Sequence, residues 1–352
     1  ADSLGIPYME VAKAAIIPAI LYFTGIFIMV HLEAKKTGLK GLSKESLPKF
    51  GELLLKRGYL IIPLLTIIIF FILGKTAIYA GLMGIISAVF VAIINDIIDI
   101  LQKRKISFGF NDIVDVICNA ARNIISVAIA CAMAGIVIGV ITLTGLGLKV
   151  GAGLVSISGG ISILLLILTM ISSIILGMGV PTTANYLITS TIAAGAIISL
   201  GFKPLAAHMF VFYFGIIADV TPPVALAAMA GAAIAKSDPF KTGLEASKLA
   251  VGAFIIPYIF IFNPAMLMLD TNLIEVIQIT ITSIIGMFGV ASCLEGYVFR
   301  KCFWIERVLF ITAGLLLIYP GSITDIIGLA TIIILVLIQI FTRKKNKTAI
   351  AN

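Results

Sequence analysis

One stretch decides the fold of this chain: residues 177–185 read Gly177-Met178-Gly179-Val180-Pro181-Thr182-Thr183-Ala184-Asn185. It interrupts an apolar region that continues on both sides of it. Hydrocarbon offers no hydrogen-bond partner, so irregular backbone at membrane depth survives only where protein buries it or where it lines a cavity. The stretch therefore predicts a break between two short helices, with a polar site at that break.

The composition of the chain supports a membrane setting. Of its 352 residues, 61% are apolar and 12% are charged, whereas soluble domains average about half apolar and a quarter charged. Apolar runs of roughly 20 residues recur, which is typical of transmembrane helices. We predict an all-α, polytopic transmembrane helical bundle. Its expected segments are 11–32, 59–73, 76–94, 123–142, 161–176, 183–200, 205–235, 249–269, 273–292, 308–319 and 323–341.

Two of these segments, 161–176 and 183–200, are marginal for a full crossing. We therefore expect 161–200 to form a re-entrant helical hairpin. A second polar break, Ala218-Asp219-Val220-Thr221-Pro222-Pro223, interrupts segment 205–235. Consecutive prolines remove two backbone donors, so this segment is expected to be one discontinuous helix. The chain then divides into a first span with a basic loop (1–58), scaffold helices (59–110), a transport repeat (111–270) and C-terminal scaffold helices with a basic tail (271–352).

Basic residues predict the orientation of the bundle. If 161–200 returns to its own side and 205–235 crosses once, 21 of the 25 basic residues fall on one face, which would be cytoplasmic. The exceptions are Lys13, Lys75, Lys149 and Lys203. The C-terminus would then be cytoplasmic, in the inner membrane. The net charge of +8 is explained by topology, so nucleic acid is not an expected partner.

The first break offers two kinds of ligand. Its glycines permit backbone conformations closed to other residues, and its proline stops the incoming helix. Freed carbonyls with the threonine hydroxyls would suit a small cation, whereas helix N–H groups and the Asn185 amide would suit an anionic substrate. The alternative is a proline-kinked helix with its hydroxyls bonded to its own backbone. The candidate site residues here are Gly177, Gly179, Pro181, Thr182, Thr183 and Asn185.

The second break contains Asp219, which alone among 17 acidic residues falls well within an apolar span. Such a carboxylate predicts a functional site. Asp219 would ligate a cation, carry a proton, or simply cap the following half-helix, since Asp is a favoured N-cap residue. The candidate residues are Ala218, Asp219, Thr221 and Pro222. Across both breaks, the candidates for binding Na⁺ are Gly177, Thr182, Thr183, Asp219 and Thr221.

Motifs of other functional classes are absent from the sequence. It contains no HExxH and no GxSxG motif, and Gly74-Lys75-Thr76 lacks the first glycine of a nucleotide-binding loop. We therefore expect no enzymatic activity and no cofactor beyond a coupling ion. The four cysteines form no CxxC pair and read as small buried hydrophobes. His208 is expected to be a packing histidine.

At the two breaks the sequence closely resembles the large membrane subunit of TRAP transporters, the tripartite ATP-independent periplasmic transporters. The resemblance rests on residues 177–185, on Pro204-Leu-Ala-Ala-His-Met-Phe-Val-Phe-Tyr-Phe-Gly215 and on Ala218-Asp-Val-Thr-Pro-Pro-Val-Ala225. The following Ala235-Lys-Ser-Asp-Pro239 is similar to fused permeases that work with TAXI-type solute-binding proteins.

This resemblance implies an elevator-type secondary transporter. It would be driven by a sodium gradient and would import an organic acid delivered by a TAXI-type periplasmic binding protein. Each of two inverted repeats in such families supplies a hairpin and a discontinuous helix. Here they would be 161–200 and 205–235, with Gly177 to Asn185 and Ala218 to Pro222 lining one sodium and substrate site.

Only one such unit is found in the sequence. The resemblance therefore implies that the first repeat and the small-subunit helices precede residue 1, so that this chain is a C-terminal portion. Three other functions remain as alternatives. An ion channel would need a continuous polar path, and a membrane-embedded enzyme would need a second catalytic group near Asp219. The third is a proton-coupled transporter that uses Asp219.

Overall fold

A computed structural model describes residues 1–39, 41, 47, 49–101, 110–222, 225–319 and 321–351. Pro223 and the basic residues Lys40, Lys44 and Lys103 to Lys105, on which the sequence analysis draws, lie outside the described residues. The chain divides into two compact units. Unit 1 comprises residues 1–12 and 40–129, and unit 2 comprises residues 13–39 and 130–352. Each unit is described by itself.

The described residues confirm the all-α class, and no named strand occurs among them. Five helical stretches in them are long and apolar enough to cross a membrane: Tyr8–Thr37, Ala77–Ile97, Pro239–Phe262, Leu273–Glu295 and Ser322–Thr342. A sixth is formed if Cys131–Thr144 and Leu146–Ser158, which bend by 73°, are one span. The predicted polytopic bundle is therefore present.

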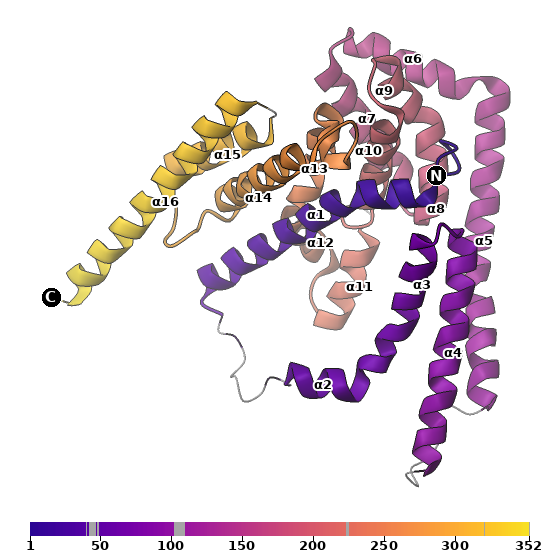
Figure 1. Cartoon of the computed structure of the whole chain (residues 1–352). Coiled ribbons are helices and arrows are strands. Elements are labelled where there is room, and N and C mark those ends of the chain that lie inside the picture. The colour runs from indigo at the N-terminus through magenta and orange to yellow at the C-terminus, as the bar shows by residue number, and fades with distance from the viewer. Residues whose placement is uncertain are drawn as a thin grey trace. The chain divides into compact units, whose positions relative to one another are not determined.

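Unit 1 is built around two antiparallel neighbours, α3 (Ile62–Ile72) and α4 (Ala77–Leu101), which lie side by side (Figure 1). Gly84 of α4 allows the close approach, because a β-carbon added there would lie 2.6 Å from Cγ1 of Ile67. The unit also contains the start of α1 (Tyr8–Thr37), α2 (Phe50–Arg57), η1 (Gly58–Ile61) and the first part of α5 (Phe110–Thr144).

Unit 2 holds both predicted breaks and the rest of α1 and α5. Its other elements are α6 (Leu146–Ser158), α7 (Ser162–Gly177), α8 (Thr182–Thr189), the π-helical turn η2 (Ser190–Ala194), α9 (Gly195–Ser199), α10 (Pro204–Ile217), α11 (Leu226–Ala235), α12 (Pro239–Leu249), α13 (Val251–Phe262), η3 (Pro264–Leu267), α14 (Leu273–Glu295), α15 (Trp304–Ile318) and α16 (Ser322–Ala351).

The core of unit 2 lies between α10 and α13. Phe210 and Phe214 of α10 are fully buried, and both rings contact the ring of Tyr258 on α13, with centroids 5.3 and 5.9 Å apart. Such edge-on aromatic pairs add stabilisation beyond the area that they bury. The second break follows directly after α10, so this aromatic core fixes one side of the candidate site.

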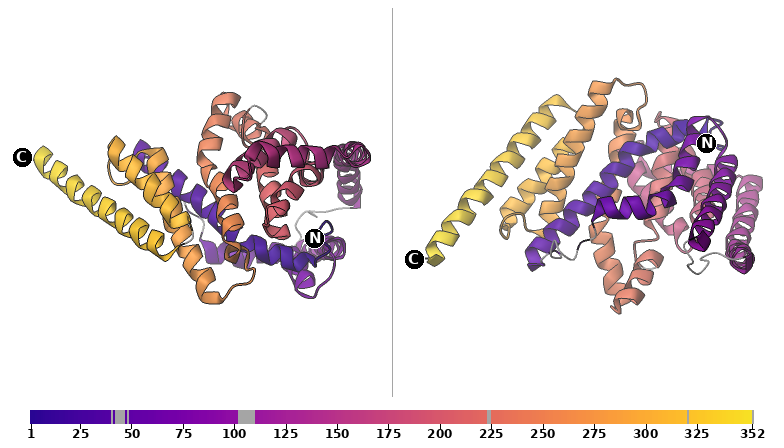
Figure 2. Two further views of the ribbon diagram at one scale, coloured as in Figure 1. Left: turned by 90° about the horizontal axis from the view of Figure 1, so that it is seen from above. Right: turned by 60° about the horizontal axis from the view of Figure 1, so that its bottom comes forward.

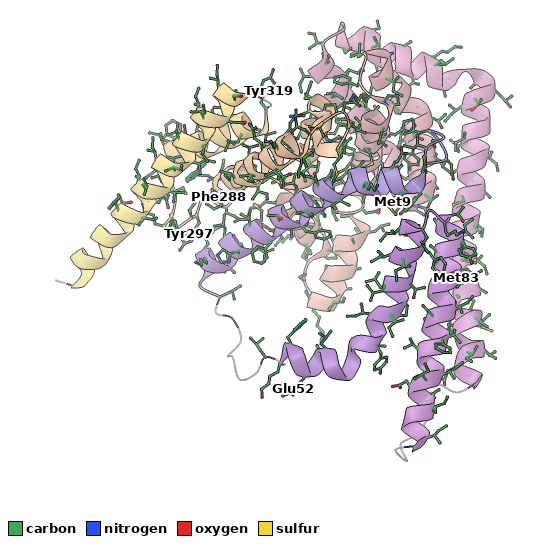
Figure 3. All side chains as sticks on the ribbon, viewed as in Figure 1. Met9, Glu52, Met83, Phe288, Tyr297 and Tyr319 are labelled. Atoms are coloured by element: carbon green, nitrogen blue, oxygen red, sulfur yellow. The ribbon has the colours of Figure 1, made fainter. Side chains whose placement is uncertain are left out.

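The three C-terminal helices pack through glycines. Figure 2 shows α14, α15 and α16 side by side. A β-carbon on Gly314 of α15 would lie 2.6 Å from the carbonyl oxygen of Gly286 on α14. On α14, Phe288, which is labelled in Figure 3, contacts Phe310 of α15, with ring centroids 6.5 Å apart. Small residues that let backbones approach closely are typical of helix packing in membranes.

Charged residues from distant parts of the sequence gather at one end of unit 2. The buried carboxylate of Glu295, at the end of α14, accepts hydrogen bonds from Lys36 Nζ of α1 at 3.2 Å and from Lys248 Nζ of α12 at 3.1 Å. Nearby in sequence, Arg300 Nε donates to Thr342 Oγ1 of α16 at 2.9 Å. Basic residues of α1, of α12 and of the segment after α14 therefore lie at this end of unit 2.

Candidate functional site

The first break has the backbone that the sequence predicts. Helix α7 ends at Gly177 and α8 begins at Thr182, with Gly179 between them at a φ of +72°. Helices α8 and α9 fold back along α7, which gives the predicted helical hairpin. At 1.5 Å per residue, α7 spans only about 24 Å, which is shorter than a hydrocarbon core of about 30 Å.

The second break separates α10 from α11 over residues 218–225. Among its described residues, two polar groups are bonded to the helices on either side. The Thr221 hydroxyl donates to the carbonyl of Ile217 at 3.1 Å, and the amide of Ala227 donates to the carbonyl oxygen of Asp219 at 3.0 Å. Thr221 thus makes the local backbone bond that competes with a ligand role. Asp219 thus contacts the start of α11 through its main-chain carbonyl and not as the side-chain cap. The N-cap residue of α11 is Ala225.

The helices that border the two breaks meet at Asn185. Its Nδ2 donates a buried hydrogen bond of 2.7 Å to the carbonyl oxygen of Gly215, in the last turn of α10. Gly177 packs against both of these groups, because a β-carbon there would lie 2.5 Å from Asn185 Nδ2 and 3.0 Å from Gly215 O. On Gly215, a β-carbon would lie 2.8 Å from Asn185 Oδ1. We call Gly177, Asn185 and Gly215 the junction.

The junction has one unused acceptor. Asn185 is 2% exposed, and its Oδ1 has no hydrogen-bond partner among the described residues. The amide orientation is fixed by chemistry, since the end that faces the Gly215 carbonyl must be the donor. A buried oxygen without a partner carries a desolvation cost unless a ligand satisfies it. The junction therefore presents a ligand oxygen, and one of the two N–H groups of its amide already donates to the Gly215 carbonyl.

The remaining candidates lie on the segments that adjoin the junction in sequence. Thr182 and Thr183 are exposed at the start of α8, and their hydroxyls make no hydrogen bond within the described part of the chain. The carboxylate of Asp219 is half-buried and is likewise without a hydrogen-bond partner there. Of the other predicted residues, Gly179 and Pro181 are exposed in the hairpin loop, Ala218 is buried and Pro222 is half-buried.

A second polar contact joins the hairpin to α10. The hydroxyl of Tyr186 on α8 and Nδ1 of His208 on α10 are 2.8 Å apart. His208 is thereby satisfied by a neighbouring helix, as expected for a packing histidine. Together with the junction, this contact fixes α8 against α10 at two points.

Helix α12 covers the second break, a contact that the sequence does not predict. Ser247 Oγ donates to the carbonyl oxygen of Val220 at 3.3 Å. One turn earlier, a β-carbon on Gly243 would lie 3.4 Å from Pro222 Cγ and 3.3 Å from the β-carbon of Ala225. The sequence signal for this contact is the glycine at position 243 followed by a hydroxyl one turn later, at Ser247.

Two hydroxyls on α7 also lack partners. Thr169 and Ser173 precede Gly177 by two turns and one turn on the same helix face, and both are fully buried. Neither hydroxyl has a hydrogen-bond partner in the described structure. They extend the set of unused oxygens from the junction along α7.

Replacement of Thr169 with valine is expected to raise the free energy of unfolding by about 1–2 kcal/mol, since it keeps the side-chain shape and removes an unpaired buried hydroxyl. The matched control is Thr189→Val, which removes an equally buried hydroxyl that donates to the carbonyl of Asn185 at 2.8 Å. That variant is expected to be less stable than the wild type. Thermal unfolding of the purified proteins compares them, and a loss of stability in Thr169→Val would contradict the assignment.

These features define a class of protein. A helical hairpin and a discontinuous helix whose breaks meet inside a polytopic bundle are the arrangement by which secondary transporters build solute sites. The family model described as tripartite ATP-independent periplasmic transporter, DctM component, matches residues 1–273. The chain belongs to this family, and is a membrane component of a TRAP transporter rather than a member of an enzyme family. Comparison with curated proteins and with solved structures found no match.

Proposed function

We propose that this chain imports an organic acid by sodium-driven, TRAP-type transport, with the acid delivered by a TAXI-type periplasmic binding protein and with small-subunit helices as a further partner. Membership of a tripartite transporter family supports a multi-component mechanism. The single observation that carries sodium coupling is the junction, where the breaks of the hairpin and of α10–α11 share one buried amide. Transport would depend on the binding of Na⁺ at this junction.

The chemistry of the junction favours a cation over an anion. An anionic substrate needs several donors, and one of the two N–H groups of Asn185 Nδ2 already donates to the Gly215 carbonyl. The side-chain oxygens without a hydrogen-bond partner among the described residues are Asn185 Oδ1, the Thr182 and Thr183 hydroxyls and the Asp219 carboxylate. Oxygen ligands of this kind suit hard cations. We therefore assign Na⁺ to the junction and place the organic acid at the exposed start of α8, where free N–H groups attract anions.

Sodium at the junction would hold the hairpin against α10. The hydrogen bond from Asn185 and the contacts of both glycines link the two elements, and an ion on Asn185 Oδ1 would add a further bond at the same place. A ligand that binds one arrangement better than another shifts the population toward it. Sodium would in this way order the hairpin tip before the acid binds, and the repeat would then move across the bilayer.

The proposed orientation follows from the gathered charges. The end of unit 2 that holds Lys36, Lys248 and Arg300 would face the cytoplasm, because basic residues are retained there. The opposite face contains the Lys203–Asp270 ion pair. With this orientation the C-terminus would be cytoplasmic, and the protein would lie in the inner membrane.

The test is uptake by the complete transporter in vesicles, with the acid that the binding protein carries. An inward sodium gradient is expected to drive accumulation, and a proton gradient of the same size without sodium is not. The reason is that the unused oxygens of the junction suit a metal ion. Uptake that is unchanged when sodium is replaced by potassium would contradict the proposal.

Proton coupling through Asp219 is the second candidate. Its carboxylate is half-buried and has no hydrogen-bond partner among the described residues, so it is available for protonation. Asp219→Asn separates the two mechanisms, since an amide keeps an oxygen ligand but cannot carry a proton. Under sodium coupling this variant retains sodium-driven uptake with a weaker sodium dependence. Under proton coupling it loses gradient-driven uptake altogether.

A further inference from the structure

An apolar cavity of about 530 Å³ opens between the first arm of the hairpin and the C-terminal helices, all within unit 2. Its walls come from α7, α13 and α15, and include Ile167, Met170, Tyr258, Phe262, Leu315 and Tyr319. Tyr319 lies just after α15 (Figure 3). This volume is in the range of about 300–1,000 Å³ that small-molecule sites occupy.

The medium around this cavity is hydrocarbon rather than water. Several of its lining side chains face outward, for example Ile167 at 37% and Leu315 at 48% exposed. These helices belong to a membrane bundle, and the surrounding liquid at this depth consists of lipid tails. An apolar cavity that is open to such a medium accepts an acyl chain without any cost of removing water.

A polar pocket of about 240 Å³ adjoins the apolar cavity, and Ile318 lines both. It lies where α15 ends and where α14 and α16 begin, and it includes Glu275, Gln278, Ser322 and Asp325. Helix ends of this kind mark the depth of lipid headgroups rather than of the hydrocarbon. The two spaces together have the layout of an amphiphile, with a tail region next to a headgroup region.

The polar pocket is acidic. Glu275 accepts a hydrogen bond from Thr271 Oγ1 at 2.8 Å, and Asp325 accepts one from Gln278 Nε2 at 3.2 Å. Among the described residues neither carboxylate forms an ion pair, and no Lys or Arg lines the pocket. Two carboxylates bonded only to neutral donors attract a cation that can donate hydrogen bonds.

We propose that these adjoining spaces form one binding site for an aminophospholipid, with an acyl chain in the cavity and a primary ammonium headgroup between Glu275 and Asp325. A choline headgroup carries the same charge but has no N–H to donate, and a glycerol headgroup leaves the phosphate charge unbalanced. The site therefore selects ethanolamine. Most of its headgroup residues lie beyond residue 273, outside the part of the chain that matches the family model.

The site places a lipid between α7 and α15. Because α7 is the first arm of the hairpin that ends at Gly177, the lipid tail would contact the same helix that forms the junction. Binding at this position stabilises the folded protein by an amount that grows with the logarithm of the lipid's affinity. This inference does not depend on which ion drives transport.

The experiment uses the full chain, purified in detergent and incubated with dioleoyl phosphatidylethanolamine, phosphatidylcholine or phosphatidylglycerol. Native mass spectrometry measures the lipid retained. We expect retention of phosphatidylethanolamine to exceed that of the other two lipids by about tenfold, the ratio that one charge-assisted hydrogen bond supports. Equal retention of phosphatidylethanolamine and phosphatidylcholine would overturn the headgroup assignment, and so would a preference for phosphatidylglycerol.

Two variants test the two halves of the site. Glu275→Gln with Asp325→Asn is expected to abolish the preference for ethanolamine and to leave residual binding of all three lipids. Ile167→Trp fills the cavity and is expected to reduce retention of every lipid. The controls are Glu245→Gln, an exposed acidic residue at the other end of unit 2, and Ile171→Trp, one turn along α7 and outside the cavity. Equal effects of test and control variants, or a dimer mass in place of bound lipid, would contradict the proposal.

Discussion

Gly215→Ala is expected to reduce sodium-driven uptake by about 5- to 100-fold, because overpacking costs about 1–3 kcal/mol and each 1.4 kcal/mol is a factor of ten in an equilibrium. The added β-carbon would lie 2.8 Å from Asn185 Oδ1, the oxygen assigned to sodium, and 3.0 Å from Nδ2. The amide would have to move away from the Gly215 carbonyl, and the two breaks would separate. Binding of radioactive sodium to the purified protein measures the same loss without a substrate.

The matched control is Gly231→Ala in α11, the second half of the discontinuous helix. A β-carbon at this glycine has no neighbour within 4 Å, and alanine is the better helix former by about 1 kcal/mol. This variant is expected to bind sodium like the wild type. Gly177→Ala should reproduce the defect from the hairpin side, since its β-carbon would lie 2.5 Å from Asn185 Nδ2. Normal sodium binding by both junction variants would show that the junction is structural only.

Glu295→Ala is expected to cause the largest loss of stability, about 2–4 kcal/mol, because it removes a buried charge that two lysines share. The Glu295 side chain is fully buried, whereas Lys36 and Lys248 retain 34% and 29% of their side-chain exposure. These lysines are partly solvated after the change, so the loss should not reach the highest values known for buried pairs. The temperature of half-unfolding in detergent is expected to fall by several degrees.

Glu245→Ala provides the comparison. Glu245 also pairs with Lys248, at 3.6 Å, but its side chain is 69% exposed. Exposed ion pairs contribute only about 0–1 kcal/mol, so this variant should unfold close to the wild-type temperature. Glu295→Gln keeps the side-chain shape and is expected to recover only part of the stability lost in the alanine variant. Complete recovery would mean that packing, and not charge, holds α1, α12 and α14 together.

Local rules explain why the sequence predicts so much of the hairpin. Proline cannot continue a helix, and glycine adopts backbone conformations that other residues avoid. The start of α8 at Thr182 and the positive φ of Gly179 follow from residues 177–182 alone. Helix α6 shows the limit of the same approach. Several glycines interrupt the apolar residues between 146 and 158, so the sequence does not predict a membrane segment there.

The partners of the site residues were beyond the reach of local rules. Gly215 lies 30 residues from Asn185, and nothing in either local sequence specifies that contact. Glu295 stands at the end of an apolar run, where a carboxylate reads as an exposed loop charge, yet the fold brings it to lysines 259 and 47 residues away. Gly243 and Ser247 of α12 likewise contact the second break, Ser247 across 27 residues of sequence, and neither local sequence specifies these contacts.

The sequence by itself determined the all-α membrane class and the places where helices stop, because hydropathy and the conformations of proline and glycine act within a few residues. Only the tertiary structure decided which end of the Asn185 amide is free, that the glycines at 177 and 215 enclose it, and which charged residues gather at one end of unit 2. Those features depend on contacts between helices that are distant in sequence, and hydrogen bonding and packing settle them only when the helices meet.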